Sequence, residues 1–204
     1  MRTALIVIDV QESFRHTPYW EAVSNPGVTD DVNRLVEICR GRGDLVIWVL
    51  HASPGSGSPF DPVNGYVRLM DGLATPLPGE PMLTKTAHNA FTTTNLDQIL
   101  TRSGIGRVVI SGIRTEQCCE TTARLASDLG YAVTFVTEAT ATTPLPHRDA
   151  PTDRTLAGVL ADPATMSADD LLRRTEQVLA GRFATIATLD DVAAQPAGGE
   201  IPVA

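Results

Sequence analysis

The chain has 204 residues, 43% of them hydrophobic and 20% charged, and its 16 basic and 24 acidic residues give a formal net charge of −8. This composition is typical of a soluble globular domain, and it excludes disordered, collagen-like and coiled-coil chains. The acidic balance argues against unaided binding to nucleic acid or to an anionic membrane, and three cysteines are too few for a secreted disulfide scaffold.

Short apolar runs recur along the chain. The first, Ala4 to Ile8, is too short for a signal-peptide core, and no segment approaches the roughly 20 apolar residues that cross a bilayer, so a cytoplasmic location is expected. Similar runs follow at Leu45–Leu50, Val108–Ile110 and Val133–Val136, and Pro81–Thr84 is a plausible further strand. Continuous rather than alternating apolarity indicates strands of a parallel sheet, buried on both faces.

Helical patterns lie between these runs, each with a capping residue and an apolar period of 3.6. Helices are expected to begin at Asp30 or Asp31, at Thr94 or Asn95, and at Thr115, the first ending near Gly41 and the third at Leu129 before Gly130. The C-terminal third of the sequence predicts a helix over Ala168–Leu179, an edge strand over Phe183–Ala187 and a helix over Leu189–Ala193. Strands and helices in alternation predict a three-layer α/β/α sandwich around a mostly parallel sheet. We expect one domain over residues 1–192 and a loose tail over residues 193–204.

Two charged residues follow predicted strands. Asp9 comes directly after the first strand, where a carboxylate is desolvated at a cost of several kcal/mol unless a partner or a function compensates. Lys85 follows the strand Pro81–Thr84. Taken singly, Asp9 could cap the next turn and Lys85 could be a surface lysine. If the two strands are near neighbours, both side chains lie at the same edge of the sheet, which favours a functional site.

Cys118 falls in the first turn of the third predicted helix, where unpaired backbone N–H groups and the helix dipole favour a thiolate. Cys119 lies on the small-residue face of the same helix, and periodicity alone does not separate the two cysteines. Cys39 is in line with Leu35 and Val36 and is predicted to be a core residue.

Four blocks of sequence resemble the signature of the isochorismatase-like cysteine hydrolases, a superfamily that includes nicotinamidases and N-carbamoylsarcosine amidase. The blocks are Asp9-Val10-Gln11, Lys85 with Ala90-Phe91 and Thr94-Asn95-Leu96, Gly112-Ile113-Arg114-Thr115-Glu116-Gln117-Cys118, and Gly130-Tyr131 with Glu138-Ala139-Thr140-Ala141. They occur in the family's order between residue 3 and about residue 143. The resemblance points to the superfamily and not to a substrate.

The resemblance implies a catalytic triad of Asp9, Lys85 and Cys118, since the family's Gly-x-x-Thr-x-x-Cys spacing reaches Cys118 rather than Cys119. It also implies a cis peptide bond before Arg114, with the backbone N–H groups of Arg114 and Cys118 forming an oxyanion hole. The expected reaction is attack of the Cys118 thiolate on an amide-type carbonyl, with Asp9 moving the proton and a thioester as the intermediate.

No metal and no cofactor are expected. Nicotinamidases carry an Asp-x-His pair after the second strand, where this chain has Val49-Leu50-His51 and lacks the carboxylate. The four histidines, His16, His51, His88 and His147, are scattered without metal-ligand spacing. His51 is then expected to be a hydrogen-bonded loop residue, and nicotinamide is not expected to be the natural substrate.

Four aromatic residues lie in or beside loops at the expected mouth and are candidates for a substrate-binding wall: Phe14, Trp20, Phe60 and Phe91. Each could instead seal the core or a subunit contact. The expected partner is a small-molecule substrate, and the resemblance implies a homo-oligomer, a dimer or a tetramer.

Two other functions stay open. One is vinyl-ether hydrolysis of the isochorismatase type, in which Asp9 protonates the substrate and no thiol is needed. The other is a binding or scaffold protein that keeps the fold without the chemistry. The proline-containing region 143–180 is less familiar than the family core and could be a specificity lid or a subunit arm.

Overall fold

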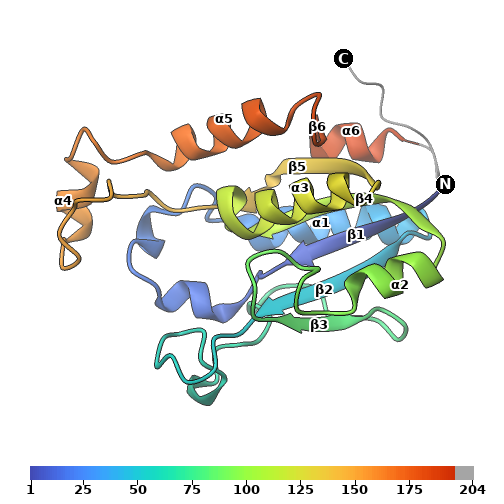
Figure 1. Ribbon diagram of the computed structural model, residues 1–204, viewed down its shortest axis with the longest axis horizontal. Helices are drawn as coiled ribbons and strands as arrows, with labels where there is room; N and C mark the ends of the chain where they lie inside the picture. The colour runs from blue at the N-terminus through green and yellow to red at the C-terminus, as the bar shows by residue number, and fades with distance from the viewer. Residues whose placement is uncertain (196–204) are drawn as a thin grey trace.

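The computed structural model describes residues 1–195, and its centre is a six-stranded sheet in the order β3-β2-β1-β4-β5-β6 (Figure 1). Every neighbouring pair of strands is parallel. The strands are β1 (Arg2–Ile8), β2 (Leu45–His51), β3 (Met82–Lys85), β4 (Ile105–Ile113), β5 (Ala132–Ala141) and β6 (Thr185–Ala187). The parallel sheet is thereby confirmed, and the predicted edge strand is present but begins at Thr185 rather than Phe183.

Helices cover both faces of the sheet (Figure 1). The α-helices are α1 (Val28–Gly41), α2 (Leu96–Arg102), α3 (Glu120–Asp128), α4 (Leu156–Leu160), α5 (Ala168–Leu179) and α6 (Leu189–Ala193). Three short 3₁₀ turns, η1 (Glu12–His16), η2 (Trp20–Ala22) and η3 (Pro62–Asn64), and one π-helical turn, η4 (Thr115–Cys119), complete the regular structure. The bounds predicted for α5 and α6 agree with the structure, and Asn95 is the N-cap of α2, as expected.

The two layers of helices pack against alternate residues of β1. Ala4, Ile6 and Ile8 belong to a core shared with α2, α3 and α5, whereas Leu5 and Val7 belong to a core shared with α1 and α6. All five side chains are buried, which explains why the run shows no alternation between apolar and polar residues. The three-layer α/β/α sandwich is confirmed.

One predicted helix start is wrong, and one helix starts where expected but with a different winding. Helix α1 begins at Val28 rather than after Asp30 or Asp31, because the Asn25 side chain accepts a hydrogen bond from the Gly27 N–H and so ends the preceding loop earlier. The third helix begins at Thr115, as predicted, but its first turn is the π-helical turn η4, whose N-cap is Arg114. A periodicity of 3.6 cannot reveal such a turn, because the wider winding shifts each side chain around the axis.

Strand β5 is longer than predicted, because its second half follows an irregularity. Ile110 pairs with Phe135, whereas Gly112 pairs with Thr140, so several residues of β5 bulge out of the ladder. Polar residues in that bulge interrupt the apolar run on which the prediction rested.

Gly112 is where β4 approaches β1 most closely. Its φ is +131°, and an added Cβ would lie 1.9 Å from the carbonyl oxygen of Ile8, the residue before Asp9. No side chain can occupy this position unless β1 moves.

Replacing Gly112 by Ala is therefore expected to lower the free energy of unfolding by on the order of 3 kcal/mol, because overpacking and an unfavourable φ combine. Gly130→Ala is the matched control, since φ is +91° there and nothing lies within 4 Å of the added Cβ. We expect Gly130→Ala to cost about 1 kcal/mol. Urea unfolding followed by circular dichroism measures both variants, and equal losses would contradict the role given to the contact with Ile8.

Between β5 and α5 the chain makes a long excursion that carries α4 away from the sheet (Figure 1). Its two arms meet in an isolated antiparallel bridge between Leu145 and Met166. The Tyr19 hydroxyl donates to the carbonyl of Arg154 at 3.3 Å and so ties the excursion to the segment after β1. Of the predicted tail 193–204, Ala193 is the last residue of α6 and residues 196–204 lie outside the described part.

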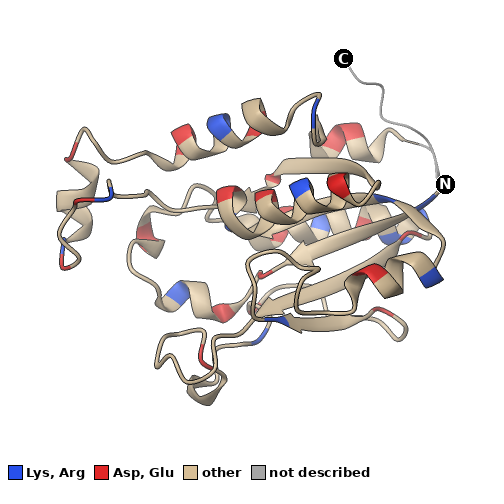
Figure 2. Ribbon diagram, in the orientation of Figure 1, with Lys and Arg blue, Asp and Glu red and all other residues tan. Residues whose placement is uncertain are grey.

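Charged residues of both signs are interspersed over the helices in the view of Figure 2. In the described part of the chain, no helix is both long enough and apolar enough to cross a membrane.

Candidate active site

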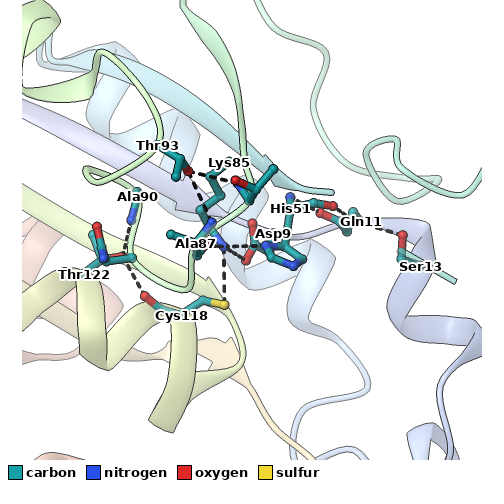
Figure 3. A network of polar contacts seen from close by, with 12 residues as sticks. Asp9, Gln11, Ser13, His51, Lys85, Ala87, Ala90, Thr93, Cys118 and Thr122 are labelled. Atoms are coloured by element: carbon teal, nitrogen blue, oxygen red, sulfur yellow. Dashed lines mark hydrogen bonds and ion pairs between the residues drawn. The ribbon is translucent and has the colours of Figure 1, made fainter. Parts of the chain in front are cut away.

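Three strands bring Asp9, Lys85 and Cys118 together at the carboxyl edge of the sheet (Figure 3). Asp9 follows β1, Lys85 is the last residue of β3, and Cys118 lies in η4 after β4. Lys85 Nζ is 2.7 Å from Asp9 Oδ2 and donates to Cys118 Sγ at 3.4 Å. Lys85 thus contacts both of the other residues that the sequence singled out for chemistry.

Lys85 is fully buried, so it is not the surface lysine that its position alone allowed. Besides Asp9 and Cys118, its ammonium donates to the Ala87 carbonyl at 3.2 Å and lies 3.4 Å from His51 Nδ1. A buried ammonium needs such a full set of acceptors, because each unpaired donor would carry a desolvation cost.

His51 occupies the end of β2, between the strands that carry Asp9 and Lys85. Burial and the nearby Lys85 lower the pKa of His51 to about 4, so its ring is neutral near pH 7 and can accept from the ammonium. Ser53 Oγ lies 3.1 Å from Nε2, so His51 is hydrogen-bonded as predicted, but it is the last residue of strand β2 rather than a loop residue. The buried Gln11 amide accepts from the His51 N–H at 2.7 Å and donates to its carbonyl at 3.0 Å. Gln11 therefore fixes the backbone of His51 from both sides (Figure 3).

Asp9 has a left-handed backbone conformation, with a φ of 54°, and its N–H donates to the Val49 carbonyl at 2.8 Å. This conformation turns the chain sharply at the end of β1. Burial raises the pKa of the Asp9 carboxyl to about 6, against the opposing effects of the nearby Lys85 and Cys118. Asp9 is thus still mostly ionised near pH 7, but it is a much stronger base than an ordinary aspartate.

The structure corrects the expectation of a resting thiolate. Burial is the main cause that raises the pKa of the Cys118 thiol to about 12, and the negative charge of Asp9 raises it further. The helix terminus therefore does not ionise the thiol. Burial likewise raises the pKa of Cys119, whose side chain is fully enclosed in the core, and that of Cys39 to about 12. Cys39 is a core residue, as predicted, and Cys118 is the cysteine that reaches a cavity.

A cavity of about 260 Å³ opens beside Cys118. Its lining combines the reacting groups, two aromatic rings and several polar side chains. The lining residues are Asp9, Phe14, Thr17, His51, Phe60, His88, Arg114, Gln117 and Cys118. A larger cavity of about 530 Å³ lies elsewhere, between the start of α1, β5 and the C-terminal helices, and contains none of the three reacting residues.

The structure places only two of the four candidate wall residues in this cavity. Phe14 and Phe60 line it and pack edge to face, with ring centroids 4.9 Å apart. Trp20 packs against Phe14 at 6.3 Å and lines neighbouring hollows instead. Phe91 is buried in the core with its ring 6.1 Å from that of Tyr131, because the loop after β3 folds onto α3.

The peptide bond between Ile113 and Arg114 is cis. Arg114 and Cys118 both line the cavity, so the two residues expected to supply oxyanion-hole N–H groups lie at its wall. Thr122 Oγ1 donates to the Cys118 carbonyl at 2.6 Å and accepts from the Ala90 N–H at 3.1 Å (Figure 3). These two bonds tie the turn that carries Cys118 to the loop after β3.

Several residues of the site escaped prediction. Gln11 stands in a family-like block, but no spacing rule gives it a role. His88 lies on the loop after β3, whose course the sequence does not fix, and Gln117 lies in the π-helical turn η4. Within residues 1–195, no group of three or more His, Cys, Asp or Glu side chains is placed to hold a metal ion.

A family model described as the Isochorismatase domain matches residues 3–165. Two similar proteins from Arabidopsis thaliana are each 33% identical. One, named a probable inactive nicotinamidase, aligns over 157 residues, 68% of this chain and 80% of that protein. The other, Nicotinamidase 3, aligns over 152 residues, 68% of this chain and 73% of that protein. The crystal structure of an isochorismatase-family protein from Chromobacterium violaceum has a TM-score of 0.81 and 24% identity, and the match covers 95% of this chain and 92% of that one.

Proposed function

Because the chain belongs to the isochorismatase family, we propose that it is a cysteine hydrolase that cleaves a C–N bond of a small amide, lactam or carbamoyl compound. The observation that supports this proposal most strongly is the placement of the Cys118 thiol at a cavity, 3.4 Å from a lysine that is itself paired with a buried aspartate. A nucleophile, a base and a group that orients the base are the usual parts of covalent hydrolysis.

The first step begins with a protonated thiol and an ionised carboxylate. Because the pKa of Cys118 is about 12 and that of Asp9 about 6, proton transfer is unfavourable by itself and is coupled to formation of the C–S bond. The sulfur attacks the carbonyl carbon while Asp9 takes the thiol proton. Lys85 stabilises the negative charge on sulfur as the proton leaves. The carbonyl oxygen becomes an oxyanion, held by the backbone N–H groups of Arg114 and Cys118.

The intermediate then collapses to a thioester. Asp9 returns the proton to the departing nitrogen, which leaves as ammonia or an amine. A water molecule gives its proton to Asp9 and attacks the thioester carbonyl, and the acid product leaves as Cys118 regains a proton. Asp9 thus acts as base and acid in turn, for which a pKa near neutrality is suited.

The relatives support the amide class, since one of them is named a nicotinamidase. Another is named a probable inactive nicotinamidase, so membership of the family does not by itself guarantee turnover. Here all three triad residues are present and in contact. Vinyl-ether hydrolysis is the second candidate, because a carboxyl group with a pKa of about 6 can also donate a proton to a substrate.

The proposal is tested by incubating the purified protein with amides, lactams and ureido compounds, with release of ammonia or amine as the readout. At least one compound is expected to be hydrolysed and to leave a transient acyl adduct on the peptide that contains Cys118. Intact-mass and peptide analysis after acid quenching detects the adduct. Hydrolysis without any adduct on Cys118, in a quench that preserves thioesters, would contradict the mechanism.

The pH dependence of kcat/KM separates the two candidates. Protonated Asp9 cannot accept the thiol proton, so amide hydrolysis is expected to fall about tenfold per pH unit below about pH 6. If a protonated Asp9 were the acid for vinyl-ether cleavage, the rate would instead rise toward low pH. Circular dichroism over the same range controls for acid unfolding, and a flat profile from pH 4.5 to 8 would contradict both roles of Asp9.

A further inference from the structure

The proposed mechanism uses only the backbone N–H of Arg114 and gives its side chain no role. Among the nine residues that line the cavity, Arg114 is the only arginine and Asp9 the only acid. The Asp9 charge is compensated from outside the lining by Lys85 at 2.7 Å. Arg114 is thus the one arginine on the cavity wall, and its partner Glu116 lies outside the lining.

The Arg114 guanidinium has polar partners, but they do not use all of its N–H donors. Its Nη2 donates to Thr143 Oγ1, and its Nη1 lies 3.7 Å from Glu116 Oε1, which is beyond hydrogen-bond distance. Only 16% of the Arg114 side chain is exposed. A guanidinium has five N–H donors, so one hydroxyl partner and one distant carboxylate leave donors for a ligand.

Glu116 itself is poorly paired. Its side chain is only 7% exposed, and in the described part of the chain neither carboxylate oxygen has a hydrogen-bond partner. Glu116 does not line the cavity, whereas Arg114 does. The Arg114 guanidinium also lies within electrostatic range of Cys118, since burial lowers the pKa of Arg114 while Glu116 and Cys118 oppose that effect. A group bound beside Cys118 is therefore within reach of the guanidinium, with Glu116 as a competing anion.

We propose that the Arg114 side chain binds a carboxylate on the substrate, so that the protein acts on small amides that also carry a carboxylate. The planar N–H fork of arginine matches the two oxygens of a carboxylate, and the surrounding protein excludes much of the water that would weaken the pair. The cavity of about 260 Å³ limits the ligand to a short one, and the rings of Phe14 and Phe60 accommodate its apolar part. This inference rests on the proposed amidase function.

The test compares three half-amides, malonamate, succinamate and glutaramate, each with the uncharged methyl ketone that replaces its carboxylate. In at least one pair, kcat/KM is expected to be about 10- to 100-fold higher for the anion, which is the range of a charge-assisted hydrogen bond. Arg114→Gln should bring that ratio close to one, and Arg114→Lys should leave an intermediate ratio, because it keeps the charge without the fork. A ratio that Arg114→Gln leaves unchanged would overturn the proposal.

Glu116→Gln is the matched variant that acts in the opposite direction. It removes the competing carboxylate while keeping Arg114, so the ratio of anionic to neutral substrate should rise by several-fold. A fall in the ratio would overturn the arrangement proposed for these two residues. If Arg114→Gln does not fold, the Arg114→Lys and Glu116→Gln proteins still decide the question.

Binding measured without turnover separates this inference from the proposed function. Calorimetry with the Cys118→Ala protein should give tighter binding of the anion than of its neutral partner, and Arg114→Gln in that background should remove the difference. If the wild-type protein hydrolyses none of the six compounds but this binding difference is found, the carboxylate-binding role of Arg114 stands and the amidase proposal fails for these compounds. Equal binding and equal hydrolysis within every pair would overturn the inference and leave the amidase proposal intact.

Discussion

Cys118→Ala is expected to lower kcat for the best amide substrate by at least about 10,000-fold, the scale on which removal of a covalent nucleophile acts. The reason is geometric. Cys118 is the cysteine that lies at the cavity and accepts a hydrogen bond from Lys85, and no other described thiol lines that cavity. Ammonia release under substrate saturation measures the loss.

Cys119→Ala provides the control within the same turn. Cys119 is fully buried in the core and does not line the cavity, so its replacement is expected to leave kcat within about threefold and to cost at most a few kcal/mol of stability. Full activity of Cys118→Ala would remove the nucleophile from the mechanism. If the Cys118→Ala protein still cleaved a vinyl ether, the vinyl-ether alternative would be favoured. If the wild-type protein hydrolysed neither amides nor vinyl ethers, a scaffold function would be favoured.

Asp9→Asn is expected to have the second large effect, on both activity and stability. Turnover should fall by about 1,000-fold or more, because general base and general acid catalysis are lost together. The free energy of unfolding should fall by about 3 to 5 kcal/mol, because Lys85 would remain in a closed site without its carboxylate. Ammonia release measures the first effect and urea unfolding the second.

The double variant Asp9→Leu with Lys85→Met tests the cause of the instability. It removes both charges, and it should recover most of the stability lost in Asp9→Asn while remaining inactive, since a buried ion pair can often be replaced by apolar groups at little cost. If the double variant were as unstable as Asp9→Asn, the loss would come from packing around Asp9 and not from the uncompensated ammonium.

The location of the site could be predicted because it depends on strand ends. Asp9 directly follows strand β1, and Lys85 is the last residue of strand β3. The carboxyl ends of parallel strands lie at the same edge of the sheet. Helical periodicity alone could not identify Cys118, because it does not distinguish Cys118 from Cys119. Only the motif spacing of the resembling family indicates Cys118. In the structure Cys118 lines the cavity, whereas Cys119 is fully buried and does not line it.

Other features of the site depend on contacts between residues distant in the sequence, which a local sequence pattern cannot predict. The pKa of Cys118 is governed by its burial next to Asp9, whereas the sequence indicated only the nearby helix terminus. The sequence predicts Phe91 at the mouth because it lies in or beside a loop there, yet that loop folds back onto α3 and buries the ring. His51 contacts Lys85 only because β2 lies between β1 and β3.

The strand order also has a consequence for how the molecule reaches its active form. Ile8, next to Asp9, pairs with Gly112 of β4, while Lys85 is held on β3 at the far side of β2. The reacting groups therefore meet only after contacts between segments distant in sequence have formed on both sides of β1, and such contacts are slow because long loops must close first. During refolding, recovery of activity should follow recovery of helical signal rather than accompany it, so activity reports the completed sheet.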